Sequence, residues 1–219
     1  MKKVVIFDLD GTLLNTLGDL ADCTNAVLVK YGFPAQPEEN YRYYVGDGAW
    51  NQMRRALGGN ADEETVKAVH ADYMALYAEN CMRRTSPYPG IPALLSRLKT
   101  DGCELAVCSN KPDARTKEMI EHYFPKAFDC VIGHIEGAPV KPDPGIVRDI
   151  LSALNAEDAR VFYVGDTATD VKTAKNAALP CAGVLWGFRD RQELEGAGAE
   201  FICGTPEELY DTIYEFFNL

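Results

Sequence analysis

Short apolar runs recur along the chain, and each of them ends at polar or glycine residues. Their apolar positions are continuous rather than alternating, which is typical of strands covered on both faces of a sheet. Segments with apolar residues at helical spacing separate the later runs, and Asp, Thr or Pro stands near the start of each segment. This alternation predicts a parallel sheet with helices on both faces. The expected strands are residues 3–10, 104–110, 128–133, 160–166 and 180–187, and the expected helices are 90–102, 113–124, 143–155 and 167–179.

Residues 15–86 break this alternation, because only helical patterns are found there. About 70 residues are far too many for a strand-to-helix connection, which commonly has roughly 2 to 6. We therefore expect a helical cap domain over residues 15–86, inserted into an α/β core with a Rossmann-like parallel sheet formed by residues 1–14 and 87–219. The proline-rich stretch at 86–92 marks the return to the core, because proline fixes φ and suits a rigid turn.

Polar side chains stand at the ends of several expected strands, or in the loops just after them. In a sheet of this kind, ligands bind at the carboxyl ends of the strands, so these side chains are expected to converge. They are Asp8 and Asp10, Ser109 and Asn110, Lys141, and Asp166 with Asp170.

The acids among them predict a cation site. Asp8 and Asp10 stand two positions apart and can face one ligand, and Gly11 lets the backbone turn away directly afterwards. Together with Asp166 they repel one another unless a cation lies between them. Hard oxygen ligands with room for water and a phosphate oxygen suit Mg²⁺.

The same residues have the chemistry of phosphoryl transfer. A carboxylate can attack phosphorus to form an aspartyl phosphate, and a neighbouring acid can protonate the leaving oxygen and then activate water. Asp8 and Asp10 are expected to share these two roles. Ser109, Asn110 and Lys141 are expected to bind the phosphoryl oxygens, and Lys141 supplies a local positive charge.

Four motifs carry a resemblance to a known family: "DLDGT" from Asp8, "SNK" from Ser109, "KP" from Lys141 and "GDTATD" from Gly165. In this order, on these expected strand ends, they resemble the haloacid dehalogenase superfamily of aspartate-nucleophile phosphatases. Further stretches, such as "DLADCTNAVLVKYGFP" and "VGDGAWNQMRRALG", are similar to bacterial phosphoglycolate phosphatases. The likeness covers essentially the whole chain.

The resemblance implies a role for each matching residue. Asp8 is then the nucleophile, Asp10 the general acid and base, and Ser109 and Lys141 the phosphate ligands. Asp8, the backbone carbonyl of Asp10, and Asp166 would hold Mg²⁺, with Asp170 supporting them. It also implies that the cap closes over the site and selects the leaving group, with 2-phosphoglycolate as the favoured substrate.

The chain departs from its likeness at a few positions. Asn15 and Thr16 stand where many relatives have Asp-Ser, and Asp47 stands where close relatives often have Asn. An extra carboxylate beside a carboxylated ligand is unfavourable. Arg54 and Arg55 in the expected cap are candidates for binding a substrate carboxylate, although a solvated helix face is the expected place of at least one of them.

Net charge and composition limit which binding partners and which cellular compartment the sequence favours. Among 219 residues, 22 Lys and Arg stand against 33 Asp and Glu, which gives a formal net charge of −11 without a basic block. Nucleic acid and anionic membrane are therefore poor partners, whereas a small phosphorylated metabolite needs only local cations. No apolar stretch approaches the roughly 20 residues of a membrane helix. Seven cysteines without a C-x-x-C pair fit a reduced cytoplasmic protein, which we expect to be a monomer or homodimer.

Other functions remain open at this level. A phosphosugar mutase or a pyrophosphatase would use the same nucleophile and differ only in what the cap admits. A non-enzymatic phospho-receiver also groups acids and a lysine around Mg²⁺, but it needs neither a cap nor Asp10. A dehalogenase is disfavoured, because a departing halide needs no proton donor.

Overall fold

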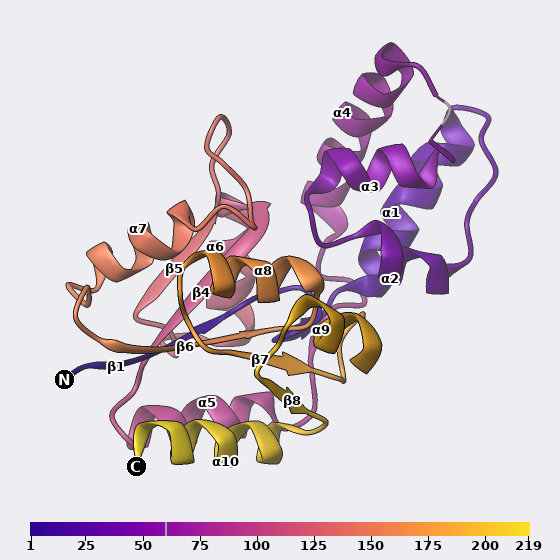
Figure 1. Cartoon of the computed structure of the whole chain (residues 1–219). Helices are drawn as coiled ribbons and strands as arrows, with labels where there is room; N and C mark the ends of the chain where they lie inside the picture. Colours follow the sequence, from indigo (N-terminus) through magenta and orange to yellow (C-terminus); the bar gives the residue numbers. More distant parts are fainter. Residues whose placement is uncertain (60) are drawn as a thin grey trace. The chain divides into compact units, whose positions relative to one another are not determined.

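The chain folds into two compact units, each described by itself. The computed structural model describes residues 1–59 and 61–219. The core unit consists of Met1–Leu14 and Pro87–Leu219, and the helical insert consists of Asn15–Ser86 (Figure 1). Two short strands, β2 (Leu14–Asn15) and β3 (Ser86–Pro87), pair where the chain passes from one unit to the other.

The core unit is built on a parallel sheet, which confirms the predicted α/β class. Within the described residues six strands pair in the order β5-β4-β1-β6-β7-β8, and all neighbouring strands are parallel. Because β1 lies between β4 and β6, the segments that follow these three strands meet at one edge of the sheet. The strands are β1 (Lys3–Phe7), β4 (Glu104–Pro112), β5 (Cys130–His134), β6 (Arg160–Gly165), β7 (Cys181–Val184) and β8 (Phe201–Cys203).

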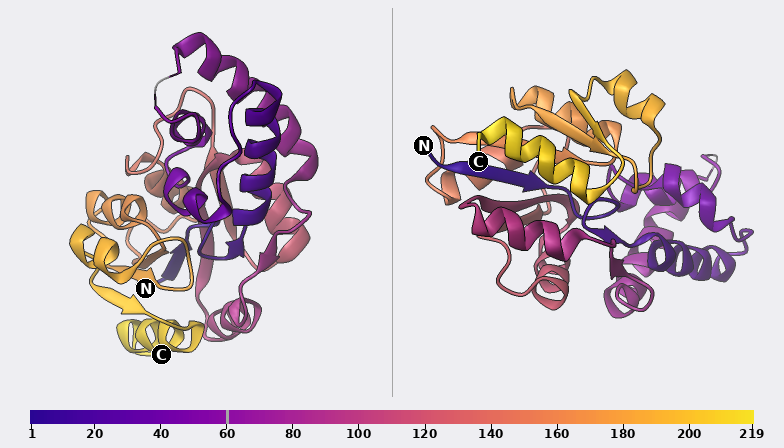
Figure 2. Two further views of the ribbon diagram at one scale, coloured as in Figure 1. Left: turned by 90° about the vertical axis from the view of Figure 1, so that its right-hand side faces the viewer. Right: turned by 90° about the horizontal axis from the view of Figure 1, so that it is seen from below.

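Helices cover both faces of this sheet, as the continuous apolar runs predict. The helices α5 (Ile91–Thr100) and α10 (Pro206–Phe217) contact each other and lie beneath the sheet in Figure 1. On the other face lie α7 (Gly145–Ala153), α8 (Ala168–Asn176) and α9 (Arg191–Ala197). The helix α6 (Asp113–Tyr123) contacts β4 and β5. Figure 2 shows both termini at the end of the sheet where β1 begins, away from the carboxyl end of that strand.

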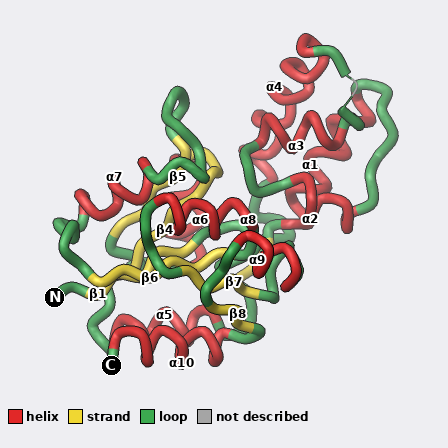
Figure 3. Tube along the Cα trace, in the orientation of Figure 1, coloured by secondary structure: helices red, strands yellow, loops and turns green. Residues whose placement is uncertain are grey.

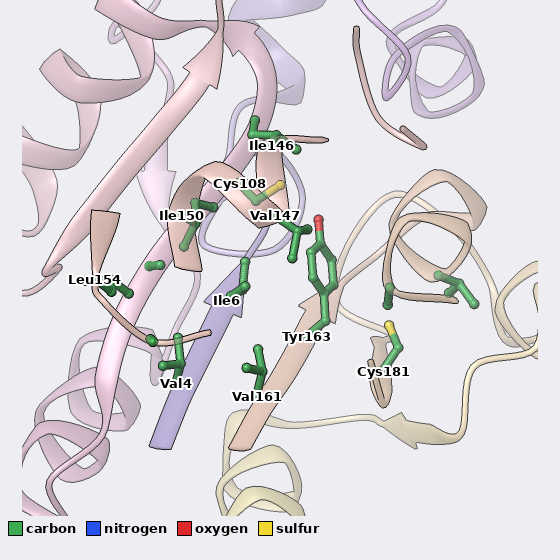
Figure 4. Packing of buried hydrophobic residues seen from close by; sticks show 14 of the residues in the cluster. Val4, Ile6, Cys108, Ile146, Val147, Ile150, Leu154, Val161, Tyr163 and Cys181 are labelled. Atoms are coloured by element: carbon green, nitrogen blue, oxygen red, sulfur yellow. The ribbon is translucent and has the colours of Figure 1, made fainter. Parts of the chain in front are cut away.

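The core follows the two-residue alternation of the strands. Residues Val4 and Ile6 of β1 and Val161 and Tyr163 of β6 point to one face, where they pack against α7 (Figure 4). All four are at most 6% exposed. Burial of an apolar side chain of this size contributes about 1.5–3 kcal/mol, so this layer holds the strand ends rigidly in place.

The helical insert is a separate small bundle (Figure 3). It contains α1 (Leu17–Lys30), a 3₁₀ turn at Glu38–Asn40, α2 (Tyr41–Tyr44), α3 (Ala49–Ala56) and α4 (Glu63–Asn80). Its two ends are tied together by Asp19, which is buried and accepts hydrogen bonds from the backbone N–H groups of Arg84 and Thr85 at 2.9 Å each.

Three elements of the core unit are absent from the sequence prediction: β8, α9 and α10. The strand β8 has three residues, which is too short for an apolar run to be recognised. A signal did exist for α10, because Thr205 caps it by accepting from Glu208 N and Pro206 occupies its first turn. No helix in the described residues is both long and apolar enough to cross a membrane.

Candidate active site

The predicted site residues of the core unit meet at the carboxyl edge of the sheet. Asp8 follows directly after β1, and its backbone N–H donates to Val164 O of β6 at 2.9 Å. Ser109 lies within the carboxyl half of β4, and Asp166 follows β6 directly. Since β4 and β6 are the two neighbours of β1, the sheet order alone brings these three side chains to one place.

Lys141 lies at the centre of this cluster. Its ammonium Nζ donates to Asp8 Oδ1 at 2.6 Å, to Asp170 Oδ1 at 2.7 Å and to Cys108 O at 3.0 Å. The lysine is 2% exposed, so water hardly screens these interactions. Burial lowers the pKa of Lys141, but the carboxylates of Asp170 and Asp8 outweigh this effect and keep the pKa well above its usual value. Lys141 is therefore a fixed positive charge.

Three buried acids face each other beside this lysine. Carboxylate oxygens of Asp8, Asp166 and Asp170 all lie within 4.8 Å of one another. Burial raises the pKa of Asp8 well above its usual value, although Lys141 opposes the change. Burial and the charge of Asp170 raise the pKa of Asp166 to about 7. Burial and mutual repulsion thus disfavour the charged forms of these carboxylates, and a divalent cation bound by oxygen ligands would stabilise them.

The chain after β7 holds Asp166 in place. The Oδ2 of Asp166 accepts a hydrogen bond from Phe188 N at 2.7 Å, and the Oδ1 of Asp166 accepts one from Thr12 Oγ1 at 3.1 Å. The indole of Trp186 donates to Thr12 O at 3.0 Å. The residues after β7 thus support the acid cluster, a role that the apolar character of Trp186 and Phe188 does not reveal in the sequence.

Asp170 joins the site to the start of α8. Its Oδ2 accepts from Thr167 N at 3.1 Å and Thr167 Oγ1 at 2.7 Å, and together the two residues form a capping box. Its Oδ1 meets Lys141. Asp170 is thus held both by the start of α8 and by Lys141, which suits a supporting position beside a cation.

Asn110 positions Lys141 through a pair of hydrogen bonds. The Lys141 N–H donates to Asn110 Oδ1 at 2.8 Å, and Asn110 Nδ2 donates to Lys141 O at 3.2 Å. The side chain that the sequence suggests as a phosphate donor thus holds the backbone of the neighbouring cation. Ser109 is 1% exposed, and its Oγ accepts from Lys111 N at 3.1 Å.

Lys111 is a residue of the site that the sequence reasoning missed. It occupies the carboxyl end of β4, its side chain is 4% exposed, and its Nζ donates to Asp10 Oδ1 at 2.8 Å. The two residues are 101 positions apart in the chain. The available signal was the "SNK" motif itself, which places a lysine directly after an apolar strand run.

Close backbone packing is required around the acids. Gly11 has φ +91°, and a Cβ there would lie 2.2 Å from Asp166 Oδ2, so both the turn and the close approach need glycine. Gly187 has an ordinary φ, but a Cβ on it would lie 2.4 Å from Asp166 Cβ. The expected role of Gly11 as the exit from the first strand is in agreement with this geometry.

In the helical insert, Asp47 and Arg55 pair with each other. Arg55 Nη1 and Nη2 reach Asp47 Oδ1 and Oδ2 at 2.5 Å each, a bidentate geometry. This pair balances the extra carboxylate that distinguished the chain from its relatives. It also occupies Arg55, one of the two arginines considered for a substrate carboxylate, while Arg54 is exposed on α3.

Comparisons with known proteins identify relatives along almost the whole chain. The phosphoglycolate phosphatase of Rhodospirillum rubrum is 35% identical over 91% of this chain and 86% of its own length. The N-acetylmuramic acid 6-phosphate phosphatase of Pseudomonas aeruginosa is 30% identical over 96% and 94%. A crystal structure of a predicted phosphatase from Clostridium acetobutylicum superimposes with a TM-score of 0.89 at 29% identity, covering 98% of this chain and 99% of the other.

The sequence profile of the haloacid dehalogenase-like hydrolases matches residues 5–184, a range that includes all four motifs. This match confirms the resemblance drawn from those motifs. The chain belongs to the haloacid dehalogenase-like hydrolase family.

Proposed function

We propose that this protein is a Mg²⁺-dependent phosphatase that hydrolyses a small phosphate monoester through an aspartyl phosphate. The single observation that supports it most is the buried contact between Lys141 and Asp8 at the end of the central strand. This contact sets a fixed positive charge beside the Asp8 carboxylate. A buried, ion-paired carboxylate at the ligand edge of an α/β sheet suits a nucleophile.

The residues then have distinct tasks. Asp8 attacks phosphorus, and the ester bond to the leaving oxygen breaks as Asp10 gives that oxygen its proton. Asp10, now a carboxylate, takes a proton from water, which hydrolyses the aspartyl phosphate and releases inorganic phosphate. Lys141 and Ser109 bind the phosphoryl oxygens, and Asn110 holds Lys141 through its backbone.

Asp8, Asp166 and the backbone carbonyl of Asp10 are the residues that would hold Mg²⁺, with Asp170 beside them. When bound, Mg²⁺ neutralises negative charge on the transferring phosphoryl group. The raised pKa values of Asp8 and Asp166 support this assignment, because burial and neighbouring carboxylates disfavour their charged forms, which a bound cation would stabilise.

The substrate proposal depends on the relatives. The name phosphoglycolate phosphatase, borne by the Rhodospirillum relative, favours 2-phosphoglycolate. The relative named for N-acetylmuramic acid 6-phosphate is nearly as similar, so the names of the relatives alone do not fix the leaving group. We assign that choice to the helical insert of residues 15–86, acting as a cap, and to the side chains near Asp10.

A substrate panel tests the proposal. Purified protein is incubated with Mg²⁺ and with phosphoglycolate, sugar phosphates, N-acetylmuramic acid 6-phosphate and pyrophosphate, and phosphate release is measured. We expect release from at least one monoester, loss of release in EDTA, its return with excess Mg²⁺, and at least a 10³-fold lower kcat in Asp8→Asn. Isomerisation of a hexose phosphate without phosphate release would indicate a mutase instead. Slow stoichiometric phosphorylation without turnover would indicate a receiver.

A further inference from the structure

A second buried lysine lies where the leaving group is expected. Lys111 and Lys141 are the lysines of the described chain that are buried, at 7% and 2% exposure. Lys141 contacts Asp8 and Asp170, on the side where phosphorus is attacked. Lys111 contacts Asp10, whose side chain is 19% exposed and is therefore more accessible than Asp8, at 8%. The two cations therefore serve different parts of the site.

The position of Lys111 is built rather than incidental. Its N–H donates to Ser109 Oγ at 3.1 Å, and its carbonyl accepts from Thr116 Oγ1 at 3.2 Å. A Cβ on Gly133 would lie 2.6 Å from this same carbonyl, so the backbone is closely packed from the β5 side as well. A lysine held at three points in a buried setting is unlike a mobile surface lysine, and keeping its charge there needs an anionic partner.

We propose that Lys111 determines substrate specificity by binding a second anionic group of the substrate, a carboxylate on the carbon next to the ester oxygen. This inference rests on the proposed function, because Asp10 marks the leaving oxygen only if it protonates it. In 2-phosphoglycolate one methylene separates that oxygen from the carboxylate, so the carboxylate lies within reach of a cation that touches Asp10. An ammonium has three N–H donors and can bind a substrate oxygen alongside Asp10 or in exchange for it.

The alternative candidates for a substrate carboxylate are two arginines of the helical insert. Arg55 is paired bidentately with Asp47, so its charge is already balanced. Arg54 is exposed and is the competing candidate. The proposal therefore favours the core lysine over the insert arginine, and variants of both decide between them.

The experiment compares two esters that differ in charge at the relevant carbon. Rates of phosphate release from 2-phosphoglycolate and from ethyl phosphate, which has two carbons and no carboxylate, are measured with Mg²⁺ in wild-type protein and in Lys111→Met, Lys111→Gln, Lys111→Arg and Arg54→Met. The readout is the ratio of the two kcat/KM values. Lys172→Met is the matched control, because Lys172 is exposed on α8 and its loss removes one positive charge.

We expect the ratio to fall about tenfold or more in Lys111→Met and Lys111→Gln, mainly through a higher KM for 2-phosphoglycolate. Lys111→Arg should recover part of it, and Lys172→Met should keep the wild-type ratio. A Lys111 that only orients Asp10 would slow both esters equally and leave the ratio unchanged, which overturns the inference. A ratio that falls in Arg54→Met but not in the Lys111 variants overturns it too. If wild-type protein hydrolyses neither ester nor any other monoester, the proposed function itself is wrong.

Discussion

Replacing Lys141 by methionine should destabilise the protein strongly, because this lysine holds two buried carboxylates. Its Nζ lies 2.6 Å from Asp8 and 2.7 Å from Asp170, and all three side chains are at most 8% exposed. Removing one partner of a buried ion pair typically costs about 3–5 kcal/mol, since the remaining charge has neither water nor a counterion. Lys141 serves two carboxylates, so we expect a loss toward the upper end of that range. Total stabilities of about 5–15 kcal/mol make this a large fraction.

The pH dependence separates a charge effect from a loss of packing. Lys141 lowers the pKa of Asp8, whose pKa burial has already raised, so removal of the lysine raises it further. Asp8 is protonated to a greater extent at pH 5 than at pH 7.5, and the protonated carboxyl group needs no counterion. Urea unfolding in EDTA should therefore show a smaller destabilisation at pH 5 than at pH 7.5. A destabilisation below about 1 kcal/mol, or one that is equal at both pH values, would refute the reasoning.

Two further variants complete this test. Lys172→Met removes an exposed lysine and should change the free energy of unfolding by no more than about 0.5 kcal/mol. The double variant Lys141→Met, Asp170→Asn removes one of the stranded charges and should recover part of the loss, which also keeps the test informative if the single variant does not fold.

Three more predictions follow from buried groups. Gly187→Ala should displace Asp166, which lowers the free energy of unfolding by about 1–3 kcal/mol and weakens Mg²⁺ binding measured by titration calorimetry. The control Gly196→Ala should be neutral or stabilising, because an added Cβ there meets no other atom within 4 Å. Equal effects of the two substitutions would contradict this prediction. Folding raises the pKa of Asp8, and it raises that of Asp166 to about 7, so the native state holds extra protons and Tm in EDTA should fall between pH 4 and 7. Mg²⁺ should therefore raise Tm more at pH 8 than at pH 5, and Asp166→Asn should reduce the dependence of Tm on pH. A Tm in EDTA that does not change with pH would contradict this prediction. Asp19→Ala leaves the backbone N–H groups of Arg84 and Thr85 without their acceptor and should lower the free energy of unfolding in urea by about 2–4 kcal/mol. A decrease below about 1 kcal/mol would show that these hydrogen bonds do not stabilise the insert.

The core sheet was predictable because its strands are buried on both faces. Each of the five expected runs overlaps a strand of the sheet, since such strands need apolar residues at every position. The ends differ: β1 stops at Phe7 and leaves Asp8 and Asp10 to the loop, whereas β4 continues to Pro112, beyond the expected end at residue 110. The strand β8 was missed, since three residues at the sheet edge need no long apolar run.

The site was predictable as a set of residues but not as a set of contacts. Four motifs at strand ends converge by topology alone, which is why Asp8, Lys141 and Asp166 could be named together. Which atoms meet depends on register and side-chain direction. Lys111 contacts Asp10, which is 101 positions away in the chain, and Asn110 contacts the backbone of Lys141, which is 31 positions away. No local sequence pattern encodes such pairings.

The balance of charge links these observations to the proposed chemistry. The site contains four carboxylates and two buried lysines; the carboxylates are those of Asp8, Asp10, Asp166 and Asp170. Arg189 also lowers the pKa of Asp166, but its charge is already balanced by Glu193 at 3.1 Å. The fully ionised cluster thus lacks two positive charges, the charge of one divalent cation. A monovalent ion leaves the deficit half filled, so we expect neither Na⁺ nor K⁺ at physiological concentration to replace Mg²⁺ in raising Tm at pH 8. Full stabilisation by either monovalent ion would show that the acids are compensated in another way.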